Sequence, residues 1–407
     1  MSLPRRCQSA VPVIFGGRNA CFSDEVSPHI EGGLSTMFEH GSNAPVSAVG
    51  VDASARRVNG LDSIRFICAF VVMLGHIGLL KDRLHGAGAI GLTKMAIGLF
   101  NCLFNGPAAV IVFFIVSGFC IHFPYIGQRV LSVRAFYSRR FIRILPPAMI
   151  YFAIQWFALD HRSNPLDTVL WSVICECVYY LAYPAILHVR RKLNLLIVIG
   201  GASIVVVPLI ATHMNSLNDG SWSYIALGPL TCIVGLPCWL IGCWLAENYT
   251  CFSVPSTAHI VLLRLGIYAS SVLLALLHNH LDSFVASNCI LLDVFAVPAC
   301  FWVGKEIAYA SRHNTIAVLE WAGAWSYSLY LIHSLAHSIV EGLGGPLFQD
   351  PRLHFIVPLV ALFASYGYFL MVERPSHRLA VVITHRYFAE IRKPLSKIPG
   401  GALGSLR

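Results

Sequence analysis

The chain has 407 residues, 56% of them hydrophobic and only 12% charged, with a mean hydropathy of +0.67. Because an ordinary soluble domain carries about 25% charged residues, this composition excludes a soluble globular protein and indicates a membrane protein. The net charge of +9 collects between the hydrophobic stretches, a pattern that reflects membrane topology. We therefore expect the lipid bilayer as a partner and no nucleic acid.

The first 57 residues differ from the rest of the chain. They are rich in Ser, Gly, Pro and Ala, and they lack the uninterrupted hydrophobic core of a signal peptide. They also show no sustained helical or strand period. We therefore predict that residues 1–57 form a disordered cytoplasmic leader, although a start codon assigned too far upstream would look the same.

From residue 58 onward, hydrophobic stretches of the roughly 17–25 residues needed to cross a bilayer follow one another. A segment in lipid must satisfy its own backbone hydrogen bonds, which favours helices over an open sheet. The stretches lie near residues 64–80, 107–123, 144–160, 169–188, 193–211, 224–246, 261–277, 288–303, 323–343 and 354–372. The sequence thus predicts an all-α, polytopic transmembrane bundle of about ten helices. Its membrane domain spans 58–378, and a basic cytoplasmic tail follows at 379–407.

Basic residues lie mostly on one side of the predicted bundle. If the N-terminus is cytoplasmic, the clusters at 129–143, 190–192, 305–312 and 374–407 all fall on the cytoplasmic side. Because Lys and Arg accumulate in cytoplasmic loops, this arrangement predicts an even number of spans with both termini cytoplasmic. The same rule offers an alternative for any arginine in these loops: it reflects membrane topology and binds no ligand.

Two ionisable residues lie inside the first predicted span. Arg65 and His76 are eleven positions apart, so both fall on one helical face, roughly 16 Å apart along the axis. Ionisable groups within membrane segments usually face the bundle interior and mark a path for substrate, ions or protons. This spacing favours a functional role for both residues.

The thirteen cysteines do not form a recognisable metal site. No two of them form a Cys-x-x-Cys pair, with two residues between the cysteines, and most lie among hydrophobic residues within the predicted spans. Cys175 and Cys177 flank Glu176 but point to different sides of a helix. The sequence therefore predicts no zinc or other metal site.

Six short motifs occur in order, roughly between residues 60 and 378: LDSIRFICAFVVMLGH, FFIVSGFCI, SRRFIRILPP, LWSVICECVYYLAYP, WSYSLYLIHS and VERPSHRL. Together they resemble the acyltransferase-3 family of integral membrane O-acyltransferases, in its stand-alone form without a fused SGNH-type domain. Two positions depart from the family pattern. Ser63 stands where many members have glycine, and Cys177 where many have a second acidic residue, which disfavours a mechanism with paired carboxylates there.

The resemblance implies transfer of an acyl group, most often acetyl from acetyl-CoA, to a hydroxyl of a carbohydrate-containing acceptor. Such acceptors include exopolysaccharide, lipopolysaccharide and glycolipids, and the relatives that modify them imply a bacterial inner membrane. An alcohol is a poor nucleophile near neutral pH, and a histidine can accept its proton. His76 is the candidate base. Glu176 is the second candidate catalytic residue, orienting His76 or binding the acceptor.

The resemblance also suggests binding residues. Guanidinium groups bind phosphate oxygens in bidentate fashion, so Arg65, Arg140 and Arg143 are candidates for binding the phosphates of CoA. Four further residues are candidates for the acceptor site: Ser117, Trp171, Tyr180 and His333.

Less specific interpretations stay open at this level. Glu176 is equally well explained as half of a salt bridge between helices, and Glu373 with Arg374 is better explained that way. Trp171 is typical of an interfacial anchor. For the whole protein, one alternative is a transporter or flippase for a lipid-linked sugar, which predicts repeated broken helices that the sequence does not show. The other is a non-catalytic partner of a polysaccharide synthase.

Overall fold

The computed structural model describes residues 58–77, 91–126, 131–159, 165, 168–212, 229–280, 288–344 and 356–391. Across these residues the chain forms helices and turns and contains no strand, which confirms the all-α prediction. The predicted leader and residues 392–407 of the predicted tail lie outside the described residues.

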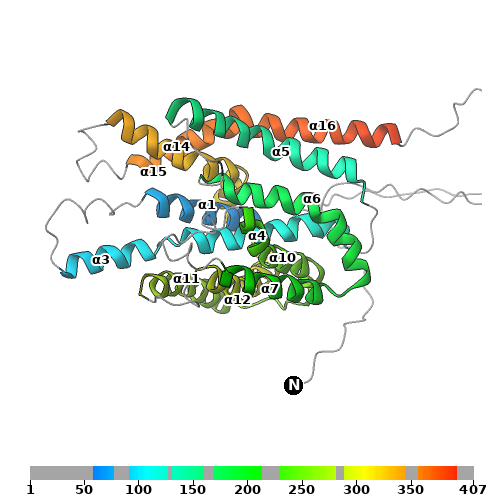
Figure 1. Cartoon of the computed structure of the whole chain (residues 1–407), viewed down its shortest axis with the longest axis horizontal. Helices are drawn as coiled ribbons and strands as arrows, with labels where there is room; N and C mark the ends of the chain where they lie inside the picture. Colours follow the sequence, from blue (N-terminus) through cyan, green and yellow to red (C-terminus); the bar gives the residue numbers. More distant parts are fainter. Residues whose placement is uncertain are drawn as a thin grey trace, which may run out of the picture. The chain divides into compact units, whose positions relative to one another are not determined.

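Figure 1 shows the helices coloured in the order in which they follow one another along the chain. Their bounds are α1 Leu61–Ile77, α3 Gly91–Cys102, α4 Gly106–His122, η1 Phe123–Tyr125, α5 Val133–Ile154, η2 Gln155–Leu159, α6 Leu170–Lys192, α7 Leu195–Thr212, α9 Thr231–Val234, α10 Leu236–Asn248, η5 Tyr249–Cys251, α11 Thr257–His280, α12 Asn288–Ala310, α13 Ala317–Gly323, α14 Ser326–Gly344, α15 Ile356–Tyr368, η8 Phe369–Glu373 and α16 Arg374–Ile391.

Within the described part of the chain, five helical segments are long and apolar enough to cross a membrane. They are Gly98–Tyr125, Leu170–Lys192, Thr231–Cys251, Thr257–His278 and Ile356–Thr384. Leu195–Val206 is apolar but shorter. The protein is therefore a multi-pass integral membrane protein, while the count of about ten crossings stays a prediction.

Helix α4 lies at the centre of the packing and is hydrophobic on all sides, as expected of a fully buried helix. It packs most closely against α10, and glycines make this approach possible. A Cβ atom on Gly118 would lie 2.0 Å from the carbonyl oxygen of Trp239, and one on Gly242 would lie 2.0 Å from that of Ile115. Helix α1 packs on another side of α4 and also contacts α13 and α14.

The start of α1 is held by a carboxylate from α13. Oε1 of Glu320 accepts hydrogen bonds from the backbone N–H of Gly60 at 3.1 Å and of Ser63 at 3.3 Å, and from Oγ of Ser63 at 2.6 Å. The first N–H groups of a helix have no partner within the helix, so this carboxylate caps α1. Gly60 has a φ of +91°, a conformation that favours glycine. The cap fixes where α1 begins and therefore where Arg65 lies.

Helix α5 contains Pro146 and Pro147 and is braced by other helices. Because Pro146 has no N–H, the carbonyl of Ile142 four residues earlier has no donor within α5, and Oγ of Ser376 donates a hydrogen bond to it instead. Oη of Tyr368 bonds the carbonyl of Pro147 at 2.5 Å. After Ile154 the helix widens into the π-helical turn η2.

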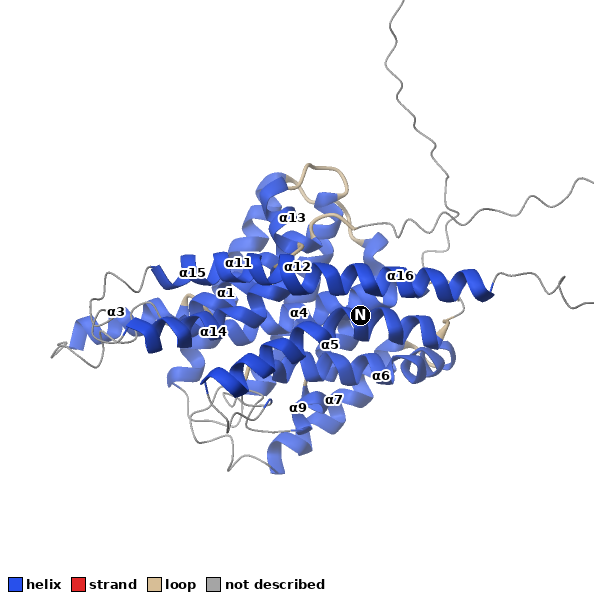
Figure 2. Cartoon of the chain, turned by 90° about the horizontal axis from the view of Figure 1, so that it is seen from above, coloured by secondary structure: helices blue, strands red, loops and turns tan. Residues whose placement is uncertain are grey.

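The last three helical segments form one continuous run from Ile356 to Ile391, so the final helix extends beyond the predicted span at 354–372. Its later part, α16, lies alongside α5 (Figures 1 and 2). Ala380 and Thr384 are buried there, although both belong to the segment predicted as a tail. This pairing fixes the orientation of α5 and of the arginines that it carries.

Candidate functional site

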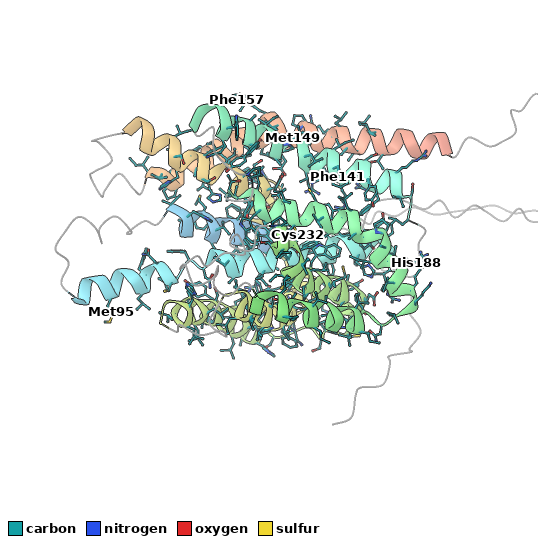
Figure 3. The ribbon with its side chains drawn as sticks, in the orientation of Figure 1. Met95, Phe141, Met149, Phe157, His188 and Cys232 are labelled. Atoms are coloured by element: carbon teal, nitrogen blue, oxygen red, sulfur yellow. The ribbon has the colours of Figure 1, made fainter. Side chains whose placement is uncertain are left out.

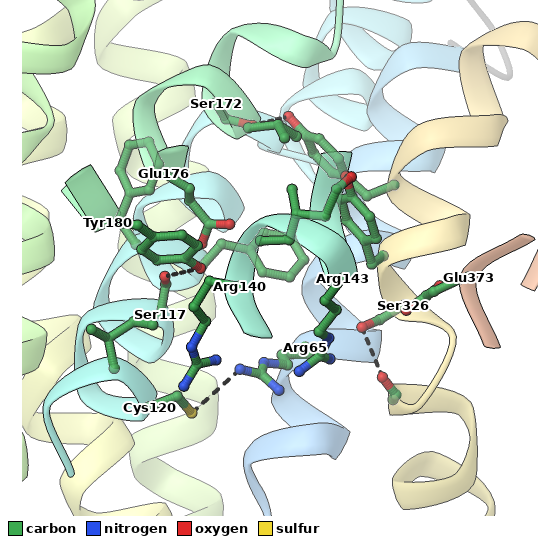
Figure 4. Close-up of a pocket in the computed structure, with 18 of the residues that line it drawn as sticks. Arg65, Ser117, Cys120, Arg140, Arg143, Ser172, Glu176, Tyr180, Ser326 and Glu373 are labelled. Atoms are coloured by element: carbon green, nitrogen blue, oxygen red, sulfur yellow. Dashed lines mark hydrogen bonds between the residues drawn. The ribbon is translucent and has the colours of Figure 1, made fainter. Parts of the chain in front are cut away.

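A cavity of about 120 Å³ lies inside the bundle, and its walls come from several helices that are far apart in the sequence (Figure 4). Helices α1, α4, α5, α6 and α14, the residues just before α14, and the end of η8 all contribute side chains. Six of the nine predicted site residues line this cavity: Arg65, Ser117, Arg140, Arg143, Glu176 and Tyr180. The structure thus brings together predicted donor-binding, catalytic and acceptor-binding residues.

Three guanidinium groups gather at one side of the cavity (Figure 4). Arg140 and Arg143 are three positions apart on α5 and so share a helical face. Arg65 reaches the same place from α1, where its Nη2 lies 3.3 Å from Sγ of Cys120 and its Nη1 lies 3.3 Å from Oδ1 of Asp62. Three cations held this close repel one another unless anions lie nearby.

The neighbouring wall carries a carboxylate and hydroxyl groups from α6 and α4. Oγ of Ser117 lies 3.3 Å from Oη of Tyr180 and also accepts a hydrogen bond from Nε1 of Trp239 at 3.3 Å. Glu176 interacts with both hydroxyls and with Arg65. Tyr180 is one turn further along α6, so Glu176 has a partner in its own helix, and the fold supplies further partners from α1 and α4. Its carboxylate lines the cavity, whereas His76 does not.

A second carboxylate in the cavity was not predicted as a site residue. Glu373, at the end of η8, is only 3% exposed, and its Oε2 accepts hydrogen bonds from the N–H of Ser328 at 3.1 Å and from Oγ of Ser328 at 2.5 Å. It also interacts with Arg143, whereas Arg374 next to it is exposed. The closing Glu-Arg-Pro motif could have indicated this residue, but the motif does not show which of its two charged side chains faces the cavity.

The two predicted histidines form a pair outside the cavity. The rings of His76 and His333 are 5.0 Å apart between centroids. Nδ1 of His76 lies 2.9 Å from the carbonyl of Val72, and Nδ1 of His333 lies 3.1 Å from that of Leu329. A carbonyl can only accept, so the neutral rings carry their proton on Nδ1 and present Nε2 as an acceptor. Nε2 of His333 is buried and has no hydrogen-bond partner.

One residue connects the histidine pair with the cavity. Tyr330 lines the cavity, and its Oη lies 2.7 Å from Oγ of Ser172. It is one turn before His333 on α14, with the two ring centroids 6.1 Å apart. A row of His76, His333 and Tyr330 therefore leads from α1 to the polar cavity.

The remaining predicted site residue, Trp171, does not line the cavity. It is buried at 8% exposure, and its ring lies 6.2 Å from that of Phe114, which does line the cavity. Trp171 therefore supports the wall of the cavity.

Comparison with known proteins identifies relatives of this chain. The acyltransferase-3 family model, described as an acyltransferase domain, matches residues 58–369. The chain is 22% identical to acyltransferase MdmB of Streptomyces mycarofaciens over 389 residues, which cover 79% of this chain and 92% of that protein. No solved structure matches the chain. Since the family model covers most of the chain, and every cavity residue named above except Glu373, this protein belongs to the acyltransferase-3 family and is a membrane acyltransferase.

Proposed function

We propose that the protein moves an acyl group, acetyl in the simplest case, from acyl-CoA to a hydroxyl of a carbohydrate-containing acceptor. Exopolysaccharide, lipopolysaccharide and glycolipids are the acceptor classes, and the bacterial inner membrane is the proposed location. The observation that carries the proposal is the convergence of Arg65, Arg140 and Arg143 on one cavity inside a membrane bundle.

The charges of the cavity support an anionic donor. Three guanidinium groups line the cavity with two carboxylates, Glu176 and Glu373, while Asp62 pairs with Arg65 from outside the lining. A guanidinium group within a bundle in lipid needs anionic partners, and a bound anion would supply further ones to this cluster. CoA offers a diphosphate and a 3′-phosphate, which the planar guanidinium fork binds through two parallel hydrogen bonds.

The chemistry proposed is attack of an acceptor hydroxyl on the thioester. A C–O bond forms, the C–S bond breaks, CoA leaves as the thiol, and the hydroxyl proton passes to a base. We assign this role to His76, with His333 beside it. The negative oxygen that develops on the thioester carbonyl needs hydrogen-bond donors in place, and the hydroxyls of Ser117 and Tyr180 supply them.

The remaining predicted residues complete the assignment. Glu176 binds a hydroxyl of the acceptor in the cavity, other than the hydroxyl that reacts, and Trp171 holds Phe114 in the cavity wall. Arg65 and His76 are roughly 16 Å apart along α1, so the donor phosphates and the base occupy different depths of the bundle. The acyl group is thus delivered partway through the membrane.

The test is mass spectrometry of cell-surface glycans and secreted glycolipids. Cells with the intact gene are compared with a deletion and with His76→Ala, at matched membrane levels of protein. Loss of one O-acyl mass in both mutants supports the proposal and identifies the acceptor. Loss in the deletion alone removes His76 as the base or favours a partner role, and no loss in either favours transport.

A further inference from the structure

A second, hydrophobic space adjoins the polar cavity between α5 and α6. We call it the α5–α6 groove; its volume is about 610 Å³. Its side chains come from α5 and η2 between Leu145 and Phe157, from Pro165, and from α6 between Leu170 and Leu181. On both helices these residues recur at intervals of three and four, so two hydrophobic stripes face each other. The volume is within the range of roughly 300–1,000 Å³ typical of small-molecule sites.

The groove and the polar cavity meet at a seam formed by residues that line one or both of them. Val173 lines both spaces. On α5, Ile144 lines the cavity, and the next residue, Leu145, begins the groove. On α6, the cavity residues Ser172 and Glu176 lie one position before Val173 and three positions after it. A ligand that enters the polar cavity therefore has a hydrophobic space directly beside it.

The order of these features along α5 matches the order of the parts of one molecule. Arg140 and Arg143 come first, Ile144 and Leu145 mark the seam, and the groove continues to Phe157, about 18 Å further along the helix axis. An acyl-CoA presents phosphates, then a thioester, then a hydrocarbon chain. Figure 3 labels Met149 and Phe157, two of the residues of α5 and η2 that line the groove.

The lining also restricts what the groove can hold. Its side chains are aliphatic or aromatic except for the thiol of Cys177 and the indole of Trp156, and it offers no charged group. A polar ligand buried there would lose its hydrogen bonds to water without replacement. A hydrocarbon chain loses none, and each methylene removed from water adds favourable free energy.

We propose that the α5–α6 groove receives the acyl chain of the donor, so that the enzyme accepts acyl-CoA with chains longer than acetyl. This inference rests on the proposed function and specifies its donor class. Val173 stands where the chain passes from the cavity into the groove. The side chains at the far end of the groove set the longest chain that fits.

The test measures donor binding, which needs no known acceptor. The full-length protein in lipid nanodiscs is loaded with radiolabelled acetyl-CoA, which is displaced with acetyl-, butyryl-, hexanoyl- and octanoyl-CoA; empty nanodiscs correct for partition into lipid. Affinity is expected to rise with chain length, by up to about fourfold per methylene held in the groove.

Variants at one exposed groove residue decide the outcome. Ala153→Leu and Ala153→Trp fill the groove in two steps, and the preference for octanoyl- over acetyl-CoA is expected to fall in that order, at least about tenfold for the larger side chain. The matched control is Ala269→Trp, at an exposed alanine of α11 outside the groove, which keeps the preference of the unmodified protein.

Each result has one meaning. If acetyl-CoA binds but affinity does not depend on chain length, or the dependence survives Ala153→Trp, then bilayer lipid fills the groove and this inference is wrong while the proposed function stands. If radiolabelled acetyl-CoA does not bind, or no unlabelled acyl-CoA displaces it, the proposed function fails, and the groove inference fails with it.

Discussion

The rings of His76 and His333 lie 5.0 Å apart, although they come from α1 and α14, near opposite ends of the membrane domain. Both rings face a carbonyl of their own helix through Nδ1, and Nε2 of His333 has no partner in its buried surroundings. An unpartnered buried nitrogen is costly, so a site that keeps one has a use for it. In the mechanism that we propose, that use is to accept or pass on a proton.

The first prediction concerns this pair. His76→Ala is expected to lower kcat by about 10²–10⁴, the usual contribution of a general base, with little change in the KM for acyl-CoA. His333→Ala should also lower kcat, and the double variant should be no slower than His76→Ala, because residues that act as one unit are not additive. Steady-state transfer rates of the purified variants measure this.

Additive losses in the double variant would show that the two histidines act separately. A rise in the KM for acyl-CoA without a change in kcat would move His76 from proton transfer to donor binding. Equal thermal stability of the variants and the unmodified protein serves as the control for folding.

Hydropathy and charge alone predicted the fold class because the bilayer restricts a spanning chain to so few structures. The helices that were found cover all ten predicted hydrophobic stretches, at least in part. The motifs also predicted Arg140 and Arg143 together, because helical spacing places both on one face. The three arginines meet because α1 and α5 both border the cavity, and only the tertiary structure shows this.

Other features depend on contacts that no local pattern contains. Glu373 was expected to join two helices, but the sequence does not show that its partners are Ser328 and Arg143 or that it lines the cavity. The role of Glu320 could not be predicted, because nothing near it in the sequence indicates that it caps α1. For Trp171 the local pattern was misleading. Its position in the sequence is typical of an interfacial anchor, but the side chain is buried.

The second prediction concerns the donor phosphates. Arg143→Gln and Arg140→Gln are expected to raise the KM for acyl-CoA at least about tenfold, because each removes a charged hydrogen bond to phosphate. Arg143→Lys should not restore binding fully, since an ammonium group lacks the bidentate geometry. Isothermal titration of CoA against the protein in nanodiscs gives the affinities directly.

A matched control for these variants lies on the same helix. Arg139 is exposed and does not line the cavity, so Arg139→Gln changes net charge equally without removing a cavity contact. If Arg139→Gln weakened CoA binding as much as Arg143→Gln, general attraction by the basic surface would explain the effect, and the phosphate site would be refuted.

The third prediction concerns the cap of α1. Glu320→Ala leaves two backbone N–H groups and the hydroxyl of Ser63 without their acceptor, and is expected to destabilise the protein by about 2 kcal/mol. Ser63→Ala removes one of these bonds and should cost about 1 kcal/mol. Thermal unfolding in nanodiscs measures both. Val318→Ala, at an exposed residue of the same helix, is the control and should leave the melting temperature unchanged.

The fourth prediction concerns the contact between α4 and α10. The Cβ atom of Gly118→Ala would lie 2.0 Å from the carbonyl oxygen of Trp239, which is backbone and cannot move aside without separating the two helices. Overpacking in a core costs typically 1–3 kcal/mol, and this contact is expected to reach the upper end of that range or exceed it. Because Ser117 and Cys120 line the cavity from the same helix, the displacement should also weaken CoA binding.

Gly201→Ala is the comparison for this effect, since it makes the same chemical change in α7, where a Cβ atom would meet nothing within 4 Å. Alanine is also the better helix former, so Gly201→Ala should be neutral or slightly stabilising. Unfolding midpoints and CoA affinities of the two variants separate the local clash from the general effect of replacing glycine. A Gly118→Ala protein as stable as Gly201→Ala would mean that α4 and α10 do not pack at the distance described here.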